Sequence, residues 1–297
     1  MYIMPRDTMQ TDIRVRPLHP SLGAEVVGVD LRQPLTDLEW RTIREALAKH
    51  LVLNVAGQDL SEDQQKAFSR RFGPLNVFAI SSYHHTVDPE ITVITNAGPD
   101  GKPKGEPGDK GSLMWHTDSI YQRVPALVTF LHAKVLPRRG GDTYFANMYQ
   151  AWEELPADLR KAVMPVEGQP RLAIHDMATG RIKTGDTPMS EAERAKVPPI
   201  AHPIVRTHPD TGRRLLYFTH HVTGIVGMPE DEALDLIERL IRFVEQDRFV
   251  YKHVWKAGDF VFWNNRATIH RATEFDFTGE LRRMQRTVTQ GTIPAYW

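Results

Sequence analysis

The sequence predicts a mainly β protein with flanking helices, folded as a jelly roll (double-stranded β-helix). Short apolar stretches typical of strands outnumber helical patterns, and the two do not alternate in the regular order of a doubly wound sheet. The 297 residues, 41% hydrophobic and 25% charged, suffice to bury the core of one large domain. We therefore expect a single domain over residues 1–297, in which helices cover one side of a two-sheet sandwich.

The N-terminal third contains clear local signals. Residues 1–12 are polar and charged, which is typical of a flexible lead-in. Thr36 with Glu39, and Ser61 with Gln64, form capping boxes, a pattern that begins helices. The elements expected here are two strands within 13–31, a helix from Thr36 to about His50, a strand at 51–56 and a helix from Ser61 to Gly73.

The rest of the chain predicts further strands, two helices and one long loop. Segment 96–112 is crowded with Gly, Pro, Lys and Asp, and its position predicts an active-site lid, the alternative being an exposed loop without a role. Residues 167–199 show no clear periodicity. The expected helices are 149–163 and 229–244, and the expected strands are 91–95, 126–136, 143–146, 200–207, 215–219, 249–255, 259–263 and 281–289.

Charge and composition exclude several classes of protein. Lys plus Arg equals Asp plus Glu at 37 each, so no overall field attracts nucleic acid or an anionic membrane. The absence of cysteine excludes disulfides, thiolate metal ligands and a cysteine nucleophile. No apolar run approaches the ~18 residues of a membrane span, and the charged N-terminus is not a secretory signal. We expect a cytoplasmic protein with a small-molecule partner and no nucleic-acid or membrane partner.

The stretch Trp115-His116-Thr117-Asp118 contains two side chains that can bind a metal. In an extended segment, residues two positions apart leave the same face, so the imidazole and the carboxylate would point the same way. His270, far downstream, supplies a third ligand. Two histidines and one carboxylate form the facial triad of non-haem Fe(II) oxygenases. Taken alone, His-x-Asp is more often a pair of surface polar residues, so the assignment depends on the rest of the chain.

Three further residues suit the binding of organic anions. The Gly-Gly-Asp-Thr segment that ends at Thr143 follows the first two candidate ligands, and Arg282 and Arg286 follow the third. Positions 282 and 286 share a face of the last predicted strand, so both side chains can point toward the ligands. Arginine suits carboxylates because its planar fork can bond them in a bidentate way. Taken singly, Thr143 could be an ordinary strand residue and Arg282 a surface cation.

This ordered set resembles the taurine and chlorophenoxyacetate dioxygenase family of Fe(II)- and 2-oxoglutarate-dependent oxygenases. The resemblance extends from about Leu22 to Gly291, and the stretches 68–73, 202–209 and 263–270 also match the family. It implies an enzyme that uses O2 and 2-oxoglutarate to hydroxylate a small anionic substrate, with release of succinate and CO2. It also implies a homodimer or a homotetramer.

The resemblance implies a role for each residue of the set. His116, Asp118 and His270 would bind Fe(II) at the catalytic centre. Thr143 and Arg282 would bind the distal carboxylate of 2-oxoglutarate.

The resemblance also bears on the primary substrate, whose acidic group Arg286 would face. Taurine-specific members carry a histidine and a tyrosine just after the Phe-Gly pair at 72–73, whereas Phe78, Ile80 and Ser81 occupy the comparable stretch here. We expect Phe78 and Ser81 to line the substrate site. A more apolar lining favours an aryloxyalkanoate-like carboxylate or an alkyl sulfonate or sulfate over taurine, which is the alternative.

Other interpretations of these residues stay open. A metal-dependent hydrolase could use zinc on the same triad, although it needs no pair of anion anchors. Asn264 stands where the family commonly has an aspartate, which would orient the metal ligands. Among the 13 histidines, His132, His202 and His253 lie in strand-like segments and are expected to be structural. The histidines that could border the pocket are His84, His85, His175, His220 and His221.

Overall fold

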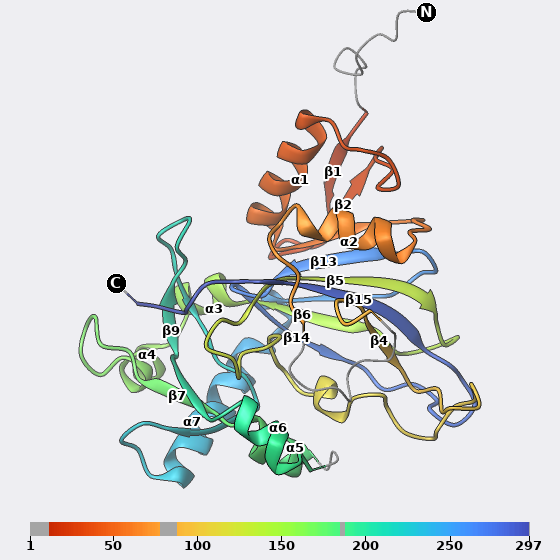
Figure 1. Cartoon of the computed structure of the whole chain (residues 1–297). Helices are drawn as coiled ribbons and strands as arrows, with labels where there is room; N and C mark the ends of the chain where they lie inside the picture. The colour runs from red at the N-terminus through yellow and green to blue at the C-terminus, as the bar shows by residue number, and fades with distance from the viewer. Residues whose placement is uncertain (1–11, 78–87, 185–187, 297) are drawn as a thin grey trace, which may run out of the picture.

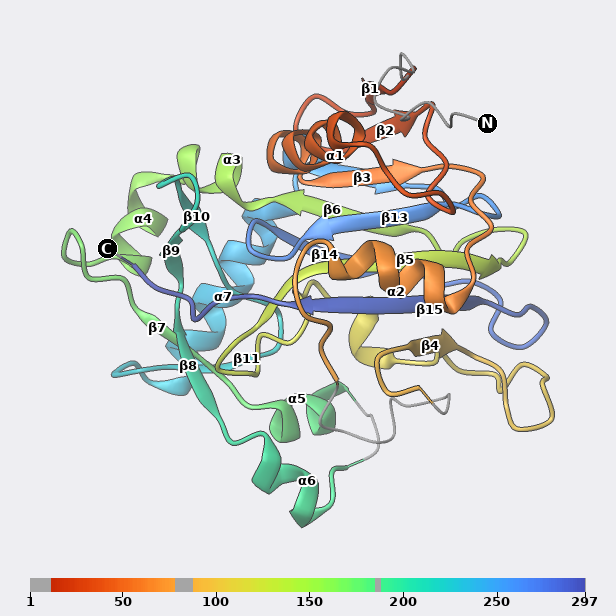
Figure 2. The same cartoon turned by 45° about the horizontal axis from the view of Figure 1, so that its top comes forward.

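A seven-stranded sheet is the largest element of the structure (Figures 1 and 2). The computed structural model describes residues 12–77, 88–184 and 188–296. Neighbouring strands in this sheet are antiparallel, except for the parallel pair β2 and β3. In spatial order the strands are β1 (Arg14–Pro17), β2 (Ala24–Val27), β3 (Val52–Val55), β13 (Phe260–Asn264), β5 (Ala126–Val135), β15 (Arg283–Gln290) and β4 (Thr92–Thr95).

Three smaller sheets complete the β structure. The one that matters for the site lies against the main sheet in Figure 1 and places β6 between β12 and β14. Its strands are β12 (Val250–His253), β6 (Thr143–Asn147) and β14 (Thr268–Ala272). The other two sheets are β11 (Val222–Ile225), β7 (Leu172–His175) and β8 (Ile200–Pro203), and the pair β10 (Arg214–Leu216) and β9 (Val205–Thr207).

Alternating side chains on the main sheet divide the core into two layers. On β13, Phe260 and Phe262 pack with the helices α1 (Asp37–His50) and α2 (Glu62–Arg70), and α2 lies across β13, β5 and β15 in Figure 2. Trp263, which points the opposite way, belongs to the second layer with residues of β6 and β14. The predicted mainly β jelly roll with helices on one side is confirmed, because two sheets share one apolar layer while helices cover the outer face.

Both predicted capping boxes begin helices. The Thr36 side chain accepts from the Glu39 backbone and the Glu39 side chain accepts from the Thr36 backbone at the start of α1, and Ser61 with Gln64 repeats the arrangement at α2. The other helices are α3 (Met148–Glu153), α4 (Ala157–Val163), α5 (Met177–Thr184), α6 (Glu191–Lys196) and α7 (Glu230–Val244), with 3-10 turns η3 (Lys110–Leu113) and η4 (Asp247–Phe249). None of the helices in the described part of the chain has the length and apolar content of a membrane span.

The structure differs from the sequence prediction in several places. The helix expected at 149–163 is two helices, because Pro156 has no N–H to continue α3 and instead begins α4. The strand expected at 200–207 breaks at Ile204 into β8 and β9. Strands β11 and β14 were not predicted, and β7, α5 and α6 occupy the segment that showed no periodicity. Of the expected lead-in, residues 1–11 lie outside the described residues.

Candidate metal centre and its pocket

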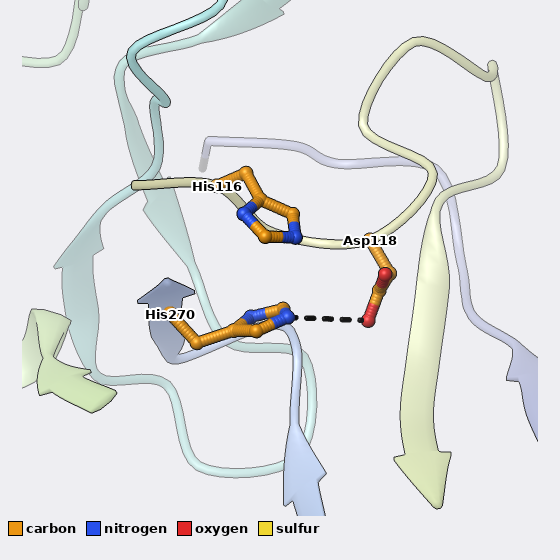
Figure 3. Close-up of side chains that lie close together, drawn as sticks. All are labelled: His116, Asp118 and His270. Atoms are coloured by element: carbon orange, nitrogen blue, oxygen red, sulfur yellow. Dashed lines mark ion pairs between the residues drawn. The ribbon is translucent and has the colours of Figure 1, made fainter. Parts of the chain in front are cut away.

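The three candidate metal ligands meet at one point from distant segments of the chain. His116 and His270 face each other across an isolated antiparallel bridge, in which each backbone N–H donates to the other's carbonyl, at 2.9 and 2.7 Å. Asp118 reaches the same point, and one donor atom from each side chain lies within 4.8 Å of the other two. Figure 3 shows both imidazoles and the carboxylate around a common space. The structure thus brings together the three residues that the sequence singled out.

The backbone conformation at Asp118 differs from the prediction. Only His116 pairs with another strand, and Asp118 begins a turn in which Ser119 has a φ of 56°. The expected extended strand with two side chains on one face is therefore wrong beyond His116. The turn is held from outside the segment, since Thr117 Oγ1 donates to the Asn265 carbonyl at 2.9 Å and Asp118 N donates to Asn265 Oδ1 at 3.3 Å.

Asn265 and Thr129 orient the carboxylate, and the sequence prediction gave neither a role. Thr129 Oγ1 donates to Asp118 Oδ2 at 2.6 Å, and Asn265 Nδ2 donates to Thr129 Oγ1 at 2.9 Å. Asn265 belongs to the Trp-Asn-Asn-Arg stretch before His270, which was the available signal, whereas Thr129 is one residue of a long strand and carried none. Asn264 accepts from Arg266 N at 3.0 Å, so it holds the turn after β13.

The protonation states leave ligand atoms available to a metal. Burial acts to raise the pKa of Asp118, but nearby positive charge, including that of Arg286, and the hydrogen bond from Thr129 outweigh it, so the pKa is lowered and the carboxylate is ionised. Burial lowers the pKa of His270 to about 3, so its ring is neutral at neutral pH. The Nδ1 of His116 lies 2.8 Å from the Met114 carbonyl oxygen and donates there, which turns the Nε2 lone pair toward the site. Two imidazoles and one carboxylate are a donor set that fits Fe(II).

Arg282 provides a buried positive charge at one end of the pocket. It is 8% exposed, and its Nε donates to the Gly141 carbonyl at 3.1 Å. No carboxylate in the described part of the chain forms an ion pair with it. Burial lowers the pKa of Arg282 to about 10, so the guanidinium stays charged at neutral pH. A buried cation without a carboxylate partner is an arrangement that a bound anion would complete.

The two glycines before Asp142 allow the chain to pass close to Arg282. Gly140 and Gly141 have φ values of 75° and 68°. A Cβ at Gly140 would lie 2.3 Å from the Glu274 carbonyl oxygen, and one at Gly141 would lie 3.0 Å from Arg282 Cδ. Thr143 follows at the start of β6 and lines the same pocket as Arg282. The predicted pair therefore lies at one site.

Arg286 reaches the pocket at a different point from Arg282. Its Nη1 lies 3.3 Å from Asp118 Oδ1, beside the candidate metal ligands. Arg282 precedes the first residue of β15, and the register of β15 with β5 shifts between Arg283 and Met284. Both arginines nevertheless line one pocket, as the sequence predicts.

A cavity of about 170 Å³ is lined by the triad and by both arginines. Asp109, Gly111 and Ser112 of the expected lid segment form part of its wall, as do His175 and His221. His220 pairs with Glu238 at 2.6 Å and is not among the lining residues. The predicted substrate residues Phe78 and Ser81, with Ile80, His84 and His85, lie outside the described residues. Three buried histidines accept or donate hydrogen bonds within the fold, as expected of structural groups: His132, His202 and His253.

Comparison with known proteins identifies relatives over nearly the whole chain. Residues 14–288 match the model of the family described as taurine catabolism dioxygenase TauD, TfdA family. The alpha-ketoglutarate-dependent 2,4-dichlorophenoxyacetate dioxygenase of Cupriavidus pinatubonensis is 37% identical over 280 residues, covering 90% of this chain and 95% of that protein. The (S)-phenoxypropionate/alpha-ketoglutarate-dioxygenase of Sphingobium herbicidovorans is 34% identical, with 89% and 90% covered. The alpha-ketoglutarate-dependent sulfate ester dioxygenase of Pseudomonas putida is 28% identical, with 95% and 91% covered.

Solved structures agree. The structure of AAD-2 in complex with Mn(II) and N-oxalylglycine superposes with a TM-score of 0.83 at 32% identity, covering 96% of this chain and 99% of that one. A taurine dioxygenase from Burkholderia xenovorans gives a TM-score of 0.77 at 30% identity, with 96% and 93% covered.

Proposed function

Because this chain belongs to the taurine catabolism dioxygenase TauD, TfdA family, we propose that it hydroxylates an aryloxyalkanoate-like carboxylate or an alkyl sulfonate or sulfate. The protein is an Fe(II)- and 2-oxoglutarate-dependent dioxygenase, alpha-ketoglutarate being another name of the same keto acid. The observation that carries the proposal is the pair of arginines in one pocket, one beside the metal-binding triad and one beside Gly141.

In this proposal each end of the pocket holds a different anion. His116, Asp118 and His270 would hold Fe(II), which when bound supplies the oxidising chemistry that couples 2-oxoglutarate decarboxylation to substrate hydroxylation. Arg282 and Thr143 would bind the distal carboxylate of 2-oxoglutarate, because this guanidinium is buried and has no carboxylate partner in the described part of the chain.

Arg286 would hold the anionic group of the primary substrate. It lies next to Asp118, so an anion bound there stands beside the metal. Apolar side chains around the cavity, Leu131 and Met177 among them, suit a hydrophobic substrate body. Taurine is the second candidate, favoured by the similarity to a taurine dioxygenase structure. A metal-dependent hydrolase on the same triad needs no pair of anion-binding arginines in its pocket.

The reaction is tested by a screen of aryloxy acids, alkyl sulfates, sulfonates and taurine, read by substrate-dependent succinate release. We expect an aryloxy acid or a sulfur ester to outperform taurine. Asp118→Ala should abolish succinate formation, because the triad loses its only carboxylate, and undiminished turnover would remove Asp118 from the ligand set. Release of succinate with taurine alone would replace the proposed substrate class by the alternative.

Alanine variants of Arg286 and Arg282 should have different effects, which distinguish the roles of the two residues. Arg286→Ala should abolish the dependence of succinate release on substrate while the Kd of 2-oxoglutarate, measured anaerobically with Fe(II), changes little. Arg282→Ala should weaken 2-oxoglutarate binding by about tenfold or more, since one charge-assisted hydrogen bond contributes about 1.5–3 kcal/mol. The reverse pattern would exchange the roles of the two residues.

We also propose a cytoplasmic homodimer or homotetramer without nucleic-acid or membrane partners. Equal numbers of acidic and basic residues support the lack of a nucleic-acid or anionic-membrane partner, and the lack of cysteine is compatible with a reducing cytoplasm. The homodimer or homotetramer is what the family resemblance implies. Within a single catalytic domain, segment 96–112 would act as a lid, because Asp109, Gly111 and Ser112 contribute to the wall of the pocket.

A further inference from the structure

His175 is a buried polar side chain in the pocket wall that the chemistry above does not use. It is the last residue of β7 and is 2% exposed. Because it lies two residues after Ala173, its side chain shares the face of β7 that packs against the apolar layer. It lines the cavity, and its ring centroid lies 5.8 Å from that of His202. Neither of its ring nitrogens has a hydrogen-bond partner among the described residues.

The two histidines closest to His175 are already engaged. His202 Nε2 lies 3.0 Å from the Gln122 carbonyl oxygen, and His221 Nε2 lies 3.1 Å from the Gly111 carbonyl oxygen. Most buried side-chain nitrogens are paired in this way, and a buried group left without a partner destabilises the fold. A site that retains such a group gains affinity for any ligand that supplies the missing hydrogen bond.

The charge state of His175 determines which chemical group of a ligand can form the missing hydrogen bond. Burial lowers the pKa of His175 to about 3, and its histidine neighbours act in the same direction. At neutral pH its ring therefore offers one N–H donor and one nitrogen acceptor, without a positive charge. Such a ring suits a neutral oxygen, while Arg282 and Arg286 provide the charges that suit anions.

We propose that His175 hydrogen-bonds a neutral polar group on the body of the primary substrate, at a distance from the anionic group that Arg286 binds. The substrate is then an organic anion whose apolar body carries a hydroxyl or carbonyl oxygen. This inference rests on the proposed function, because it assumes that Arg286 binds the anion and that the cavity holds the substrate body. It narrows the proposed substrate class from organic anions with an apolar body to those whose body also carries an uncharged hydrogen-bonding group.

Matched pairs of phenoxyacetates, which carry either a hydroxyl or a methyl group at the same ring position, test the proposal. The readouts are substrate affinity for the anaerobic Fe(II)–2-oxoglutarate enzyme and kcat/KM for succinate release. At one ring position the wild-type enzyme should favour the hydroxyl compound by about tenfold or more, since a site built to hydrogen-bond a substrate rejects the analogue that lacks the group. His175→Phe should remove this preference by weakening only the hydroxyl compound, and His175→Gln should restore part of it.

Three outcomes would count against these assignments, and they are distinguishable. Equal use of both members of every pair by the wild-type enzyme would overturn the role of His175, whether or not a variant folds. A preference that survives in His175→Phe, with 2-oxoglutarate affinity unchanged, would place the polar contact on another residue. If no pair stimulated succinate release although 2-oxoglutarate binds, the proposed substrate class would fail, and the inference would fail with it.

Discussion

Trp255 affects the Arg282 end of the pocket through one hydrogen bond. Its Nε1 donates to Thr143 Oγ1 at 3.0 Å, and both groups are buried. The indole packs edge-on against His253, with ring centroids 4.7 Å apart, and His253 is held by Asp259 at 3.1 Å. Because Thr143 accepts from Trp255, its own O–H remains free to donate to the distal carboxylate that Arg282 would bind. Trp255 is in this view a positioning residue for Thr143.

Replacing Trp255 by Phe should weaken 2-oxoglutarate binding about fivefold, the equivalent of ~1 kcal/mol for one neutral hydrogen bond. A keto acid without a distal carboxylate, such as 2-oxobutyrate, should bind both proteins equally. The same change made on top of Thr143→Val should add nothing, because the residues act through one contact. Trp152→Phe, in a buried tryptophan of α3 that does not line the pocket, is the matched control. Equal weakening of both keto acids by Trp255→Phe would reduce its role to general packing.

At the scale of elements, the sequence predicts best those segments whose signals are local. The capping boxes at Thr36 and Ser61 hold α1 and α2 by contacts within four residues, so the pattern alone indicates where each helix begins. Strand β14 has no comparable local signal. It follows a tight turn after β13 and exists because it pairs with β6, where His270 lies opposite Phe145. Pairing between distant segments is a property of the tertiary fold, which a local pattern does not report.

The candidate site divides in the same way. The triad, Thr143 and the two arginines could be predicted because residue type and order are visible in the chain. The turn at Asp118 could not, because the Asn265 side chain holds it from another segment. Thr129 was missed for the same reason, since its contact with Asp118 appears only once β5 is in place. His175 was named as a residue that could border the pocket. That its ring nitrogens have no partner among the described residues is apparent only when β7 lies between β11 and β8.

At the scale of the whole molecule, the jelly roll explains how the ligands converge. The apolar layer between the two sheets contains Trp263 of β13, Phe145 of β6 and Ile269 of β14. The ring of His270 packs against both Trp263 and Phe145, at centroid distances of 4.7 and 5.9 Å. The same packing that stabilises the sandwich therefore fixes the imidazole before a metal binds.

Burial of neutral histidines also makes the whole fold sensitive to acid. Burial lowers the pKa of His175 to about 3 and that of His208 to about 4, whereas the unfolded chain takes up these protons at about pH 6.5. Between these values the unfolded state binds more protons, so the free energy of unfolding falls as pH falls, by up to ~1.4 kcal/mol per pH unit for each group. His175→Phe removes one such group, and its stability should decline less steeply than that of the wild type from neutral pH to about pH 5. Urea unfolding of the metal-free proteins across this range measures both slopes, to which all other titrating groups contribute equally. Parallel curves would mean that His175 takes up its proton over the same pH range in the folded and the unfolded protein, and burial would then not lower its pKa as the structure indicates.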